Sequence, residues 1–441
     1  MNDFETGRQP VIVTGVRTPF LKSGGAYAAL SGHSLAAAPM AELRRRCDLA
    51  PDGVDLVTLG MVVQDVDATN AAREAMLSAG FSSRVPAWTV SMAGVSPNVG
   101  VGSICDQILL GRVDSALACG ADNFSDLPVR FGRSLRQRAV SLATARSLAE
   151  RLRILAGIRP GDLLPHVPSA TDLTTGLTMG ECAERMARRF GVDRNDSDAY
   201  ALRSHRLATE AWTTGRFADE VMAIDLANGS RVERDDTPRS DTTLERLGAL
   251  RPSFVEDGII TAGNASGLTD GAAALLLMST AAAARAGHDP LARIIDYQFT
   301  GVADLRDEML LGPAMAIPPL LHRHGLAMQD IEVFELHEAF AATVVKCRRD
   351  LGIDDLPCLA GFGLAVGASF QGHPLEIGEV KRRITGEYED ATVVSIKSDR
   401  PDAQELDLSL GDLLGFGPDD FQPGFGQRFK LILRKRDQQI G

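Results

Sequence analysis

Two histidines occupy local sequences that can hold an imidazole ready for chemistry. His337 follows residues 331–336, whose four apolar side chains are typical of a strand, and it precedes a helical pattern over 338–349. Ligands usually bind where parallel strands end, so we expect this imidazole to face a substrate. His373 stands between a glycine and a proline, which predicts a fixed turn rather than a helix. Together the two imidazoles can polarise a carbonyl group and stabilise an enolate.

Each histidine also has a simpler interpretation. His337 can cap the helix that we expect to begin at residue 338, and His373 can serve its turn as a structural residue only. The chain continues after His373 with two carboxylates, Glu376 and Glu379, near the start of a predicted helix. These acids either change the proton affinity of the imidazole or face solvent.

Short apolar runs closed by glycine or polar residues predict a series of buried strands in the first part of the chain. They cover residues 10–15, 56–60, 87–90 and 115–120, and helical patterns over 34–46, 70–80 and 96–110 lie between them. Strands that alternate with helices require crossover connections. We therefore expect an α/β fold with a mostly parallel sheet.

The composition changes over residues 125–250, where Arg, Asp and Ser become frequent and amphipathic helices replace the strand pattern. Such a segment is typical of a lobe inserted into an α/β domain. With 441 residues, the chain is long enough for more than one domain. The predicted boundaries are 1–124 for the first half, 125–250 for the inserted lobe, 251–285 for the completion of the first half, and 286–441 for the second half.

The second half returns to the strand–helix order, which suggests an internal duplication. Its predicted strands cover 292–297, 331–336, 391–396 and 429–433, and its predicted helices cover 313–324 and 338–349. The acidic, Gly- and Pro-rich stretch 399–426 separates the last two strands, although a hairpin needs only about two to five linking residues. We interpret this stretch as an insertion or as the replacement of a functional loop.

The charge balance and the cysteine pattern exclude several functions. The net charge is −12 and no long run of Lys or Arg occurs, which argues against nucleic acid as a partner. The six cysteines lack the paired spacing of zinc ligands, so we expect reduced thiols and no metal. The N-terminus is polar and acidic, unlike a signal peptide, and no apolar run reaches the roughly eighteen residues of a membrane span. We expect a cytoplasmic protein.

Several stretches, in order along the chain, resemble the thiolase superfamily. They are Gly15–Phe20, 62–64, 70–74, Gly176–Gly180, Leu250–Pro252, Thr261–Ala272, 337–340 and 372–374. The likeness is closest to the long-chain thiolases that form the β-subunit of trifunctional fatty-acid oxidation enzymes, and the His-Glu-Ala-Phe spelling at 337–340 points to that branch. The resemblance implies a five-layered αβαβα fold of two similar halves, with an inserted loop domain that covers the active site.

The same resemblance carries expectations about ligands and partners. It implies a coenzyme A thioester such as acyl-CoA as the substrate, with no permanently bound cofactor. It also implies a homodimer or a higher oligomer. A hetero-oligomer with another enzyme subunit is a further expectation.

The resemblance aligns Gly94 with the cysteine that accepts the acyl group in thiolases. Residues 89–96 are typical of a strand that turns into a helix, as at that position of the family. Glycine has no side chain that could form a thioester, so the covalent step lacks its nucleophile. Cys105 lies eleven residues further on, about 16 Å along a helix, and its apolar neighbours indicate a core thiol.

The remaining catalytic positions of the family fall near the end of the chain. The second family cysteine acts as an acid and base, and its place falls near Lys397, while no cysteine follows Cys358. Lys397 is either a base with a lowered pKa or a solvated loop residue. In the family, the histidine at the place of His373 activates the nucleophile and binds the thioester oxygen. The one at the place of His337 holds a water or the oxyanion on the opposite side.

The resemblance also indicates a binding surface. Arg239 matches an arginine near the adenine and phosphates of coenzyme A. The residues that match the pantetheine tunnel are Met179, Leu250, Ala265, Ser266, Ala339 and Phe340. Alternatively, Arg239 is a charged loop residue, and Leu250 and Phe340 belong to the ordinary core.

Three hypotheses for the function stay open at this point. The chain can be an enzyme that makes or breaks a C–C bond beside a coenzyme A thioester without an acyl-enzyme, as in retro-aldol cleavage. It can transfer an acyl group by direct attack of a bound nucleophile. It can also be an inactive thiolase-like subunit of a multienzyme complex. The two histidines favour an active enzyme, because an inert scaffold does not need them.

Overall fold

The computed structural model describes residues 7–166, 171–353 and 358–359. His373, Lys397 and the stretch 399–426 lie outside these residues, as do the strands predicted over 391–396 and 429–433. Within the described part of the chain, no helix combines the length and the apolar character that a membrane crossing requires.

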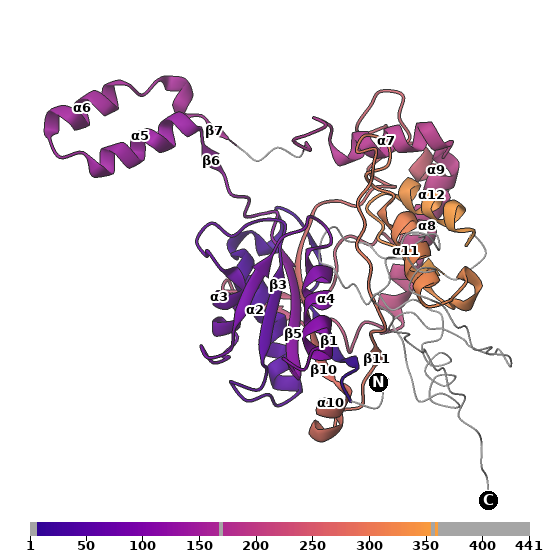
Figure 1. The fold of residues 1–441 in the computed structure, drawn as a ribbon. Helices are drawn as coiled ribbons and strands as arrows, with labels where there is room; N and C mark the ends of the chain where they lie inside the picture. The colour runs from indigo at the N-terminus through magenta and orange to yellow at the C-terminus, as the bar shows by residue number, and fades with distance from the viewer. Residues whose placement is uncertain (1–6, 167–170, 354–357, 360–441) are drawn as a thin grey trace, which may run out of the picture. The chain divides into compact units, whose positions relative to one another are not determined.

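A seven-stranded sheet organises the first half of the chain (Figure 1). Its strand order is β11–β1–β10–β5–β3–β4, and the short strand β2 pairs with β10. The bounds are Pro10–Arg17 for β1, Leu21–Lys22 for β2, Leu56–Gly60 for β3, Ala87–Val90 for β4, Ser115–Asp122 for β5, Thr269–Ser279 for β10 and Ala292–Arg293 for β11. The four strands predicted before residue 120 are therefore confirmed.

The prediction of a mostly parallel sheet is wrong for this half. Strands β3, β4 and β5 run parallel, but β10 runs antiparallel to both β1 and β5, and β11 runs antiparallel to β1. The chain returns to the sheet after residue 250, and β10 then inserts between β1 and β5 in the opposite direction. The sequence of the strands before residue 120 gives no sign that a later strand will enter the sheet between two of them. The resulting sheet is mixed.

Helices cover both faces of the sheet. Helices α2 (Gly32–Arg46) and α3 (Ala71–Ser78) share one apolar cluster with Val57 and Leu276, whereas α4 (Ser96–Leu109) shares another with Leu275 and Leu277. This division follows from the strand period of two, which sends successive side chains of β10 to opposite faces. All eleven residues of β10 are buried, as expected for a central strand covered on both sides.

The segment between β5 and β10 is mainly helical, as its composition predicts. Its elements are β6 (Arg130–Phe131), α5 (Arg133–Thr144), α6 (Leu148–Ala156), η2 (Pro160–Leu163), β7 (Pro165–His166), α7 (Met179–Phe190), α8 (Arg194–Thr213), β8 (Ile224–Asp225), β9 (Arg231–Val232) and α9 (Leu244–Gly248). Helices α5 and α6 contain no buried residue, and Val140 and Leu148 are largely exposed. By contrast, α7 and α8 each bury a face.

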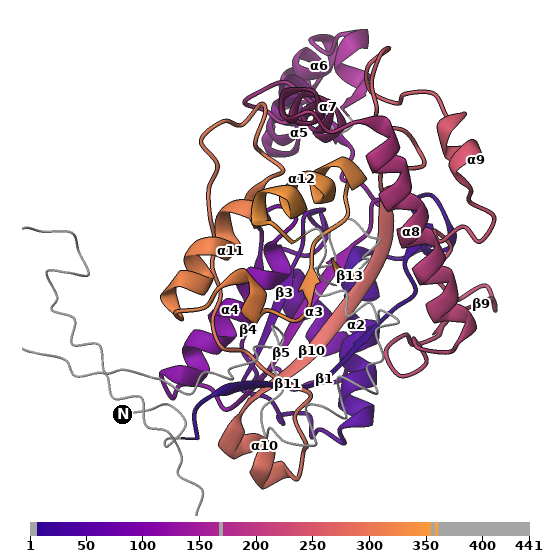
Figure 2. The same cartoon turned by 90° about the vertical axis from the view of Figure 1, so that its right-hand side faces the viewer.

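Helix α10 (Thr280–Ala286) follows β10 at the end of the first half. The described part of the second half contains α11 (Gly312–Arg323), η3 (Met328–Asp330), β12 (Phe334–Glu335), α12 (Ala341–Leu351) and β13 (Cys358–Leu359). Strands β12 and β13 pair in parallel. Helix α12 packs against α7, α8 and α11 (Figure 2). The first half adds one 3₁₀ turn, η1 (Ala26–Ala29).

The predicted start of the helix after His337 is wrong by three residues. Helix α12 begins at Ala341 rather than at residue 338, and β12 already ends at Glu335. His337 therefore lies in the connection between the two elements. Phe340 is the residue that precedes the helix, and no side chain caps it. The capping interpretation of His337 is wrong for the same reason.

Candidate functional site

The turn at Gly94 has the geometry that its sequence predicts. It connects β4 to α4, and Ala93 adopts a left-handed backbone with φ of +47°. The fully buried Ser96 holds the turn, because its hydroxyl accepts a hydrogen bond from Met92 N at 2.7 Å and donates one to Ala93 O at 2.6 Å. A left-handed residue other than glycine is uncommon and costs free energy, so this conformation is imposed by its surroundings.

Gly94 itself has open space beside it among the residues that the structure describes. A Cβ atom built on Gly94 would have no atom of the described residues within 4 Å. Gly60, at the end of β3, is the opposite case, because a Cβ there would lie 2.2 Å from the backbone nitrogen of Pro97. The absence of a side chain is thus required by packing at Gly60 but not at Gly94.

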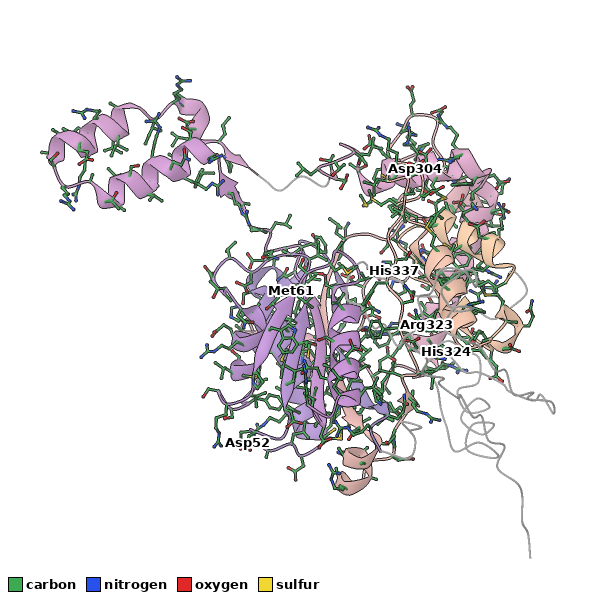
Figure 3. All side chains as sticks on the ribbon, in the orientation of Figure 1. Asp52, Met61, Asp304, Arg323, His324 and His337 are labelled. Atoms are coloured by element: carbon green, nitrogen blue, oxygen red, sulfur yellow. The ribbon has the colours of Figure 1, made fainter. Side chains whose placement is uncertain are left out.

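His337, labelled in Figure 3, lies on the connection before α12, and its residue is exposed. The surrounding protein nevertheless lowers the pKa of its imidazole through desolvation. A neutral ring is favoured at pH 7, and a neutral imidazole can donate a hydrogen bond from one nitrogen. This state suits a group that stabilises an oxyanion.

The neighbour of His337 is a buried acid. The Glu338 carboxylate accepts hydrogen bonds from the hydroxyl groups of Tyr200 at 2.6 Å and Ser204 at 2.5 Å, both of which lie on α8. Hydrogen bonds to a charged acceptor are stronger than those between neutral groups. They tie the connection that carries His337 to α8.

Four of the predicted tunnel residues lie together: Ala265 and Ser266 of the first half contact Ala339 and Phe340 of the second half. Ser266 N donates to Ala339 O at 2.8 Å, and Ala265 forms an isolated antiparallel bridge with Phe340. Ala341 N donates to the backbone oxygen of residue 264 at 2.9 Å. The structure thereby joins the segment 264–266 to the connection that carries His337.

The other two predicted tunnel residues, Met179 and Leu250, lie near residues 254 and 263, which contact Phe340 and precede the segment 264–266, respectively. Met179 begins α7, and a Cβ on the next residue, Gly180, would lie 2.2 Å from the ring of Phe254. That ring packs edge-on against Phe340, with 6.2 Å between the ring centroids. Leu250 lies against Gly263, because a Cβ there would lie 2.7 Å from Leu250 Cδ1.

Arg239 is exposed, and its backbone is held by a buried histidine, His205, for which the sequence gives no signal. Arg239 N donates to His205 Nδ1 at 3.3 Å. Burial, together with the nearby positive charge of Arg239, lowers the pKa of His205 to about 4. The ring is therefore neutral at pH 7, as a nitrogen that accepts a hydrogen bond must be.

The structure brings some of the predicted site residues together, whereas the predictions for others stay untested. Ala265, Ser266, Ala339 and Phe340 are in direct backbone contact beside His337. The pairing of the two imidazoles stays a prediction, since residue 373 is not described. The roles assigned to these residues stay predictions too.

The prediction for Cys105 is confirmed. The thiol is buried in α4, and burial raises its pKa to about 12, so it is a protonated core residue. In the described ranges, no group of three His, Cys, Asp or Glu side chains could hold a metal ion.

Several residues of the site could not be recognised from sequence alone. Phe254, Tyr200, Ser204 and His205 lie in stretches whose patterns predict only helix or loop. Glu338 gives a clearer signal, because an acid directly after a candidate catalytic histidine, and followed by the apolar residues Ala339 and Phe340, requires donors if it is buried.

These features define an α/β protein with a mixed sheet covered on both faces and candidate site residues in the connections that follow β4 and β12. The chain belongs to the thiolase family. The thiolase N-terminal domain matches residues 10–281, and the thiolase C-terminal domain matches residues 288–388. The predicted family is thereby confirmed. Members of the thiolase family act on coenzyme A thioesters without a permanently bound cofactor, in agreement with the predicted substrate class.

Similar proteins of known name support the same family. The chain is 38% identical over 381 residues to the mitochondrial trifunctional enzyme subunit beta of Bos taurus, covering 83% of this chain and 80% of that protein. It is 39% identical over 338 residues to the 3-ketoacyl-CoA thiolase of Yersinia enterocolitica, covering 76% and 77%. The crystal structure of the Bacillus anthracis acetyl-CoA acetyltransferase matches with a TM-score of 0.71 and 33% identity, covering 85% of this chain and 93% of that one. The predicted thiolase fold is confirmed.

Proposed function

We propose that this protein is an enzyme of acyl-CoA metabolism that makes or breaks a C–C bond beside the thioester without forming an acyl-enzyme. One observation carries the proposal: the Gly94 turn keeps the strained backbone of a nucleophile turn but has no thiol. The His337 connection, by contrast, retains its imidazole and a buried acid beside it. The retained groups suit enolate stabilisation, whereas the missing one is needed only for acyl transfer to the protein.

A retro-aldol cleavage fits these groups. A base removes the proton of the hydroxyl group on the β-carbon, and that oxygen becomes a carbonyl as the bond between the α- and β-carbons breaks. The electron pair of the broken bond moves to the thioester enolate. His337 donates a hydrogen bond to the enolate oxygen, and a proton then returns to the α-carbon. No bond to a protein sulfur forms at any stage.

Direct acyl transfer is the second candidate reaction. The open space at Gly94 favours it, because a bound nucleophile could occupy the position of the missing side chain. In that reaction the nucleophile attacks the thioester carbonyl, and the thiol of coenzyme A leaves. Both reactions use the same binding groups, for which we propose Arg239 and Ser266.

We also propose a cytoplasmic homodimer or higher oligomer. The name of the Bos taurus relative, a subunit of a trifunctional enzyme, supports a hetero-oligomer as an alternative. In that case the chain can be an inactive subunit that pairs with an active enzyme.

The test combines binding, turnover and mass measurement. We expect calorimetry to detect binding of coenzyme A or acyl-CoA, and we expect no thiolysis of acetoacetyl-CoA and no acyl adduct by mass spectrometry. A 3-hydroxyacyl-CoA should be cleaved to acyl-CoA and an aldehyde or ketone. If coenzyme A does not bind at millimolar concentration, both enzyme proposals fail and the inactive subunit remains. An acyl adduct on the wild-type protein would instead restore ordinary thiolase chemistry.

A further inference from the structure

Helix α8 contacts three segments of the candidate site through buried polar side chains. Its residues Ser204 and His205 are consecutive and almost fully buried. Consecutive helix positions point about 100° apart, so the two side chains reach different neighbours. Ser204 reaches the connection before α12, and His205 reaches the loop that carries Arg239.

The contact at the His337 end uses two hydroxyl groups on one face of α8. Tyr200 and Ser204 are four residues apart, which places them one above the other along the helix. Both donate to Glu338, at 2.6 and 2.5 Å, and all three groups are buried. Because Glu338 follows His337 directly, the orientation of this carboxylate limits the position of the catalytic candidate.

A third contact connects α8 to the tunnel segment. Asp198 Oδ1 accepts a hydrogen bond from Asn264 Nδ2 at 2.8 Å, and Arg194 bonds to the other oxygen of that carboxylate at 2.6 Å. Asn264 is buried and precedes Ala265, which bridges to Phe340. The helix therefore contacts both sides of the bridge between residues 264–266 and 339–341.

The contact at the opposite end fixes a backbone rather than a side chain. His205 Nδ1 accepts from Arg239 N at 3.3 Å, while the guanidinium group of this exposed residue stays available to solvent or ligand. A backbone anchor of this kind orients a long side chain without competing for its charge.

We propose that α8 positions both ends of the coenzyme A thioester site. Tyr200 and Ser204 position His337 through the carboxylate that follows it, and His205 positions Arg239 for the nucleotide end. These are positioning residues, because none of them is required to touch the substrate. The inference rests on the proposed function for the ligand, but the contacts themselves can be tested without it.

The first experiment tests the His337 end by nuclear magnetic resonance of histidine-labelled protein. Loss of a ring signal in His337→Gln identifies the His337 imidazole. In the double variant Tyr200→Phe/Ser204→Ala, we expect this signal to move and its titration midpoint to change, while the affinity for coenzyme A stays within twofold of the wild type. The control is Thr213→Ala, an exposed hydroxyl on the same helix. An unchanged His337 signal in a folded double variant overturns this half of the proposal.

The second experiment tests the Arg239 end with two readouts. In His205→Leu, amide hydrogen exchange at Arg239 should become faster, and the dissociation constant for coenzyme A should rise by about three- to tenfold, as for one lost hydrogen bond. His205→Asn places an oxygen near the former Nδ1 and should restore both values. Unchanged exchange at Arg239 overturns this half. Faster exchange with unchanged affinity also overturns it, because the anchor would then not serve binding.

The two experiments separate this inference from the proposed function. If the wild-type protein does not bind coenzyme A, the proposed function fails. The His337 signal and the Arg239 exchange rate still decide whether α8 positions the two segments. Where a variant unfolds, Glu338→Gln provides the second test of the His337 end, since it keeps the shape of the acceptor but removes its charge.

Discussion

The Gly94 turn and the His337 connection differ in what holds them. The first is held locally: Ser96 bonds to the backbone of Met92 and Ala93, and none of the described residues fills the space beside Gly94. The second is held by distant segments, namely α8 and residues 264–266. A turn that depends on its own few residues can lose a functional side chain without losing its shape. A connection held by buried polar contacts cannot change one residue without leaving others unpaired.

The largest effect should follow from removing the imidazole of His337, whereas adding a methyl group at Gly94 should change little. His337→Ala should lower turnover of the acyl-CoA substrate by roughly 100- to 10,000-fold, as for the loss of an acid–base or oxyanion group. Gly94→Ala should leave turnover within about threefold, because its methyl group enters open space. Steady-state kinetics of both variants make the comparison. Equal losses in the two variants would show that Gly94, too, is in close contact with the substrate.

Gly94→Cys restores the nucleophile that the proposed reaction lacks. Incubation with acetyl-CoA should increase the mass of this variant by one acetyl group, whereas the wild type and Gly94→Ala should stay unmodified. The cysteine sulfur then forms the new thioester, and the thiol of coenzyme A leaves with the proton. Intact-protein mass spectrometry checks the result. An unmodified Gly94→Cys that still binds coenzyme A would mean that the turn does not present its residue to the thioester.

The packing contrast between two glycines can be measured by stability. Gly60→Ala should lower the free energy of unfolding by about 1–3 kcal/mol, because the new methyl group collides with the backbone of Pro97. Gly94→Ala should change it by less than about 0.5 kcal/mol, as at an ordinary open position. Urea denaturation of the two variants gives both values. A stable Gly60→Ala variant would mean that α4 can move away from the sheet.

A buried acid in the first half, Asp122, predicts a pH dependence of the free energy of unfolding. Burial and the nearby charge of Asp270 raise the pKa of Asp122 to about 7, although two backbone N–H groups, of Val62 and Val63, oppose the shift. Because an unfolded aspartic acid titrates near pH 4, the folded state binds more protons between about pH 4 and 7. Stability should therefore fall as the pH rises through this window.

Denaturation of Asp122→Asn across this range provides the check. The variant should lose most of the pH dependence, since its side chain cannot ionise. Asp270 also has a raised pKa, so part of the slope should remain. A slope equal to that of the wild type would assign the effect to other groups.

The smallest effect concerns strain in the turn itself. Ala93→Gly should raise the free energy of unfolding by up to about 1 kcal/mol, because glycine adopts a positive φ without a steric penalty. The added freedom of the unfolded chain reduces this gain. Thermal unfolding measures the difference. A destabilised variant would show that the methyl group of Ala93 makes contacts that outweigh the strain.

The two regions also differ in how much of them could be predicted from sequence. The strand, the turn and the helix around Gly94 were predicted correctly, because their signals lie within some twenty adjacent residues. After His337, the sequence predicts a helix that begins three residues before the observed start at Ala341, since residues 338–340 have no helix-breaking sequence. Their backbone is instead held by Ala265 and Ser266, far away in the chain. Such a long-range pairing leaves no local pattern.

The same reason explains the other differences. The antiparallel insertion of β10 between β1 and β5 depends on how the chain returns after a long inserted segment. The hydroxyl groups of Tyr200 and Ser204 are indistinguishable in sequence from solvated helix residues. Their significance depends on Glu338, which is more than 130 positions away.

The open space beside Gly94 has a consequence at the level of the gene. Glycine codons GGT and GGC become cysteine codons TGT and TGC through a change of the first base. Since a Cβ atom at Gly94 would meet none of the described residues within 4 Å, a point mutation of this kind could place a sulfur in the turn without moving them. Where the codon of Gly94 is GGT or GGC, a lineage that carries this chain is one nucleotide away from a cysteine in this turn.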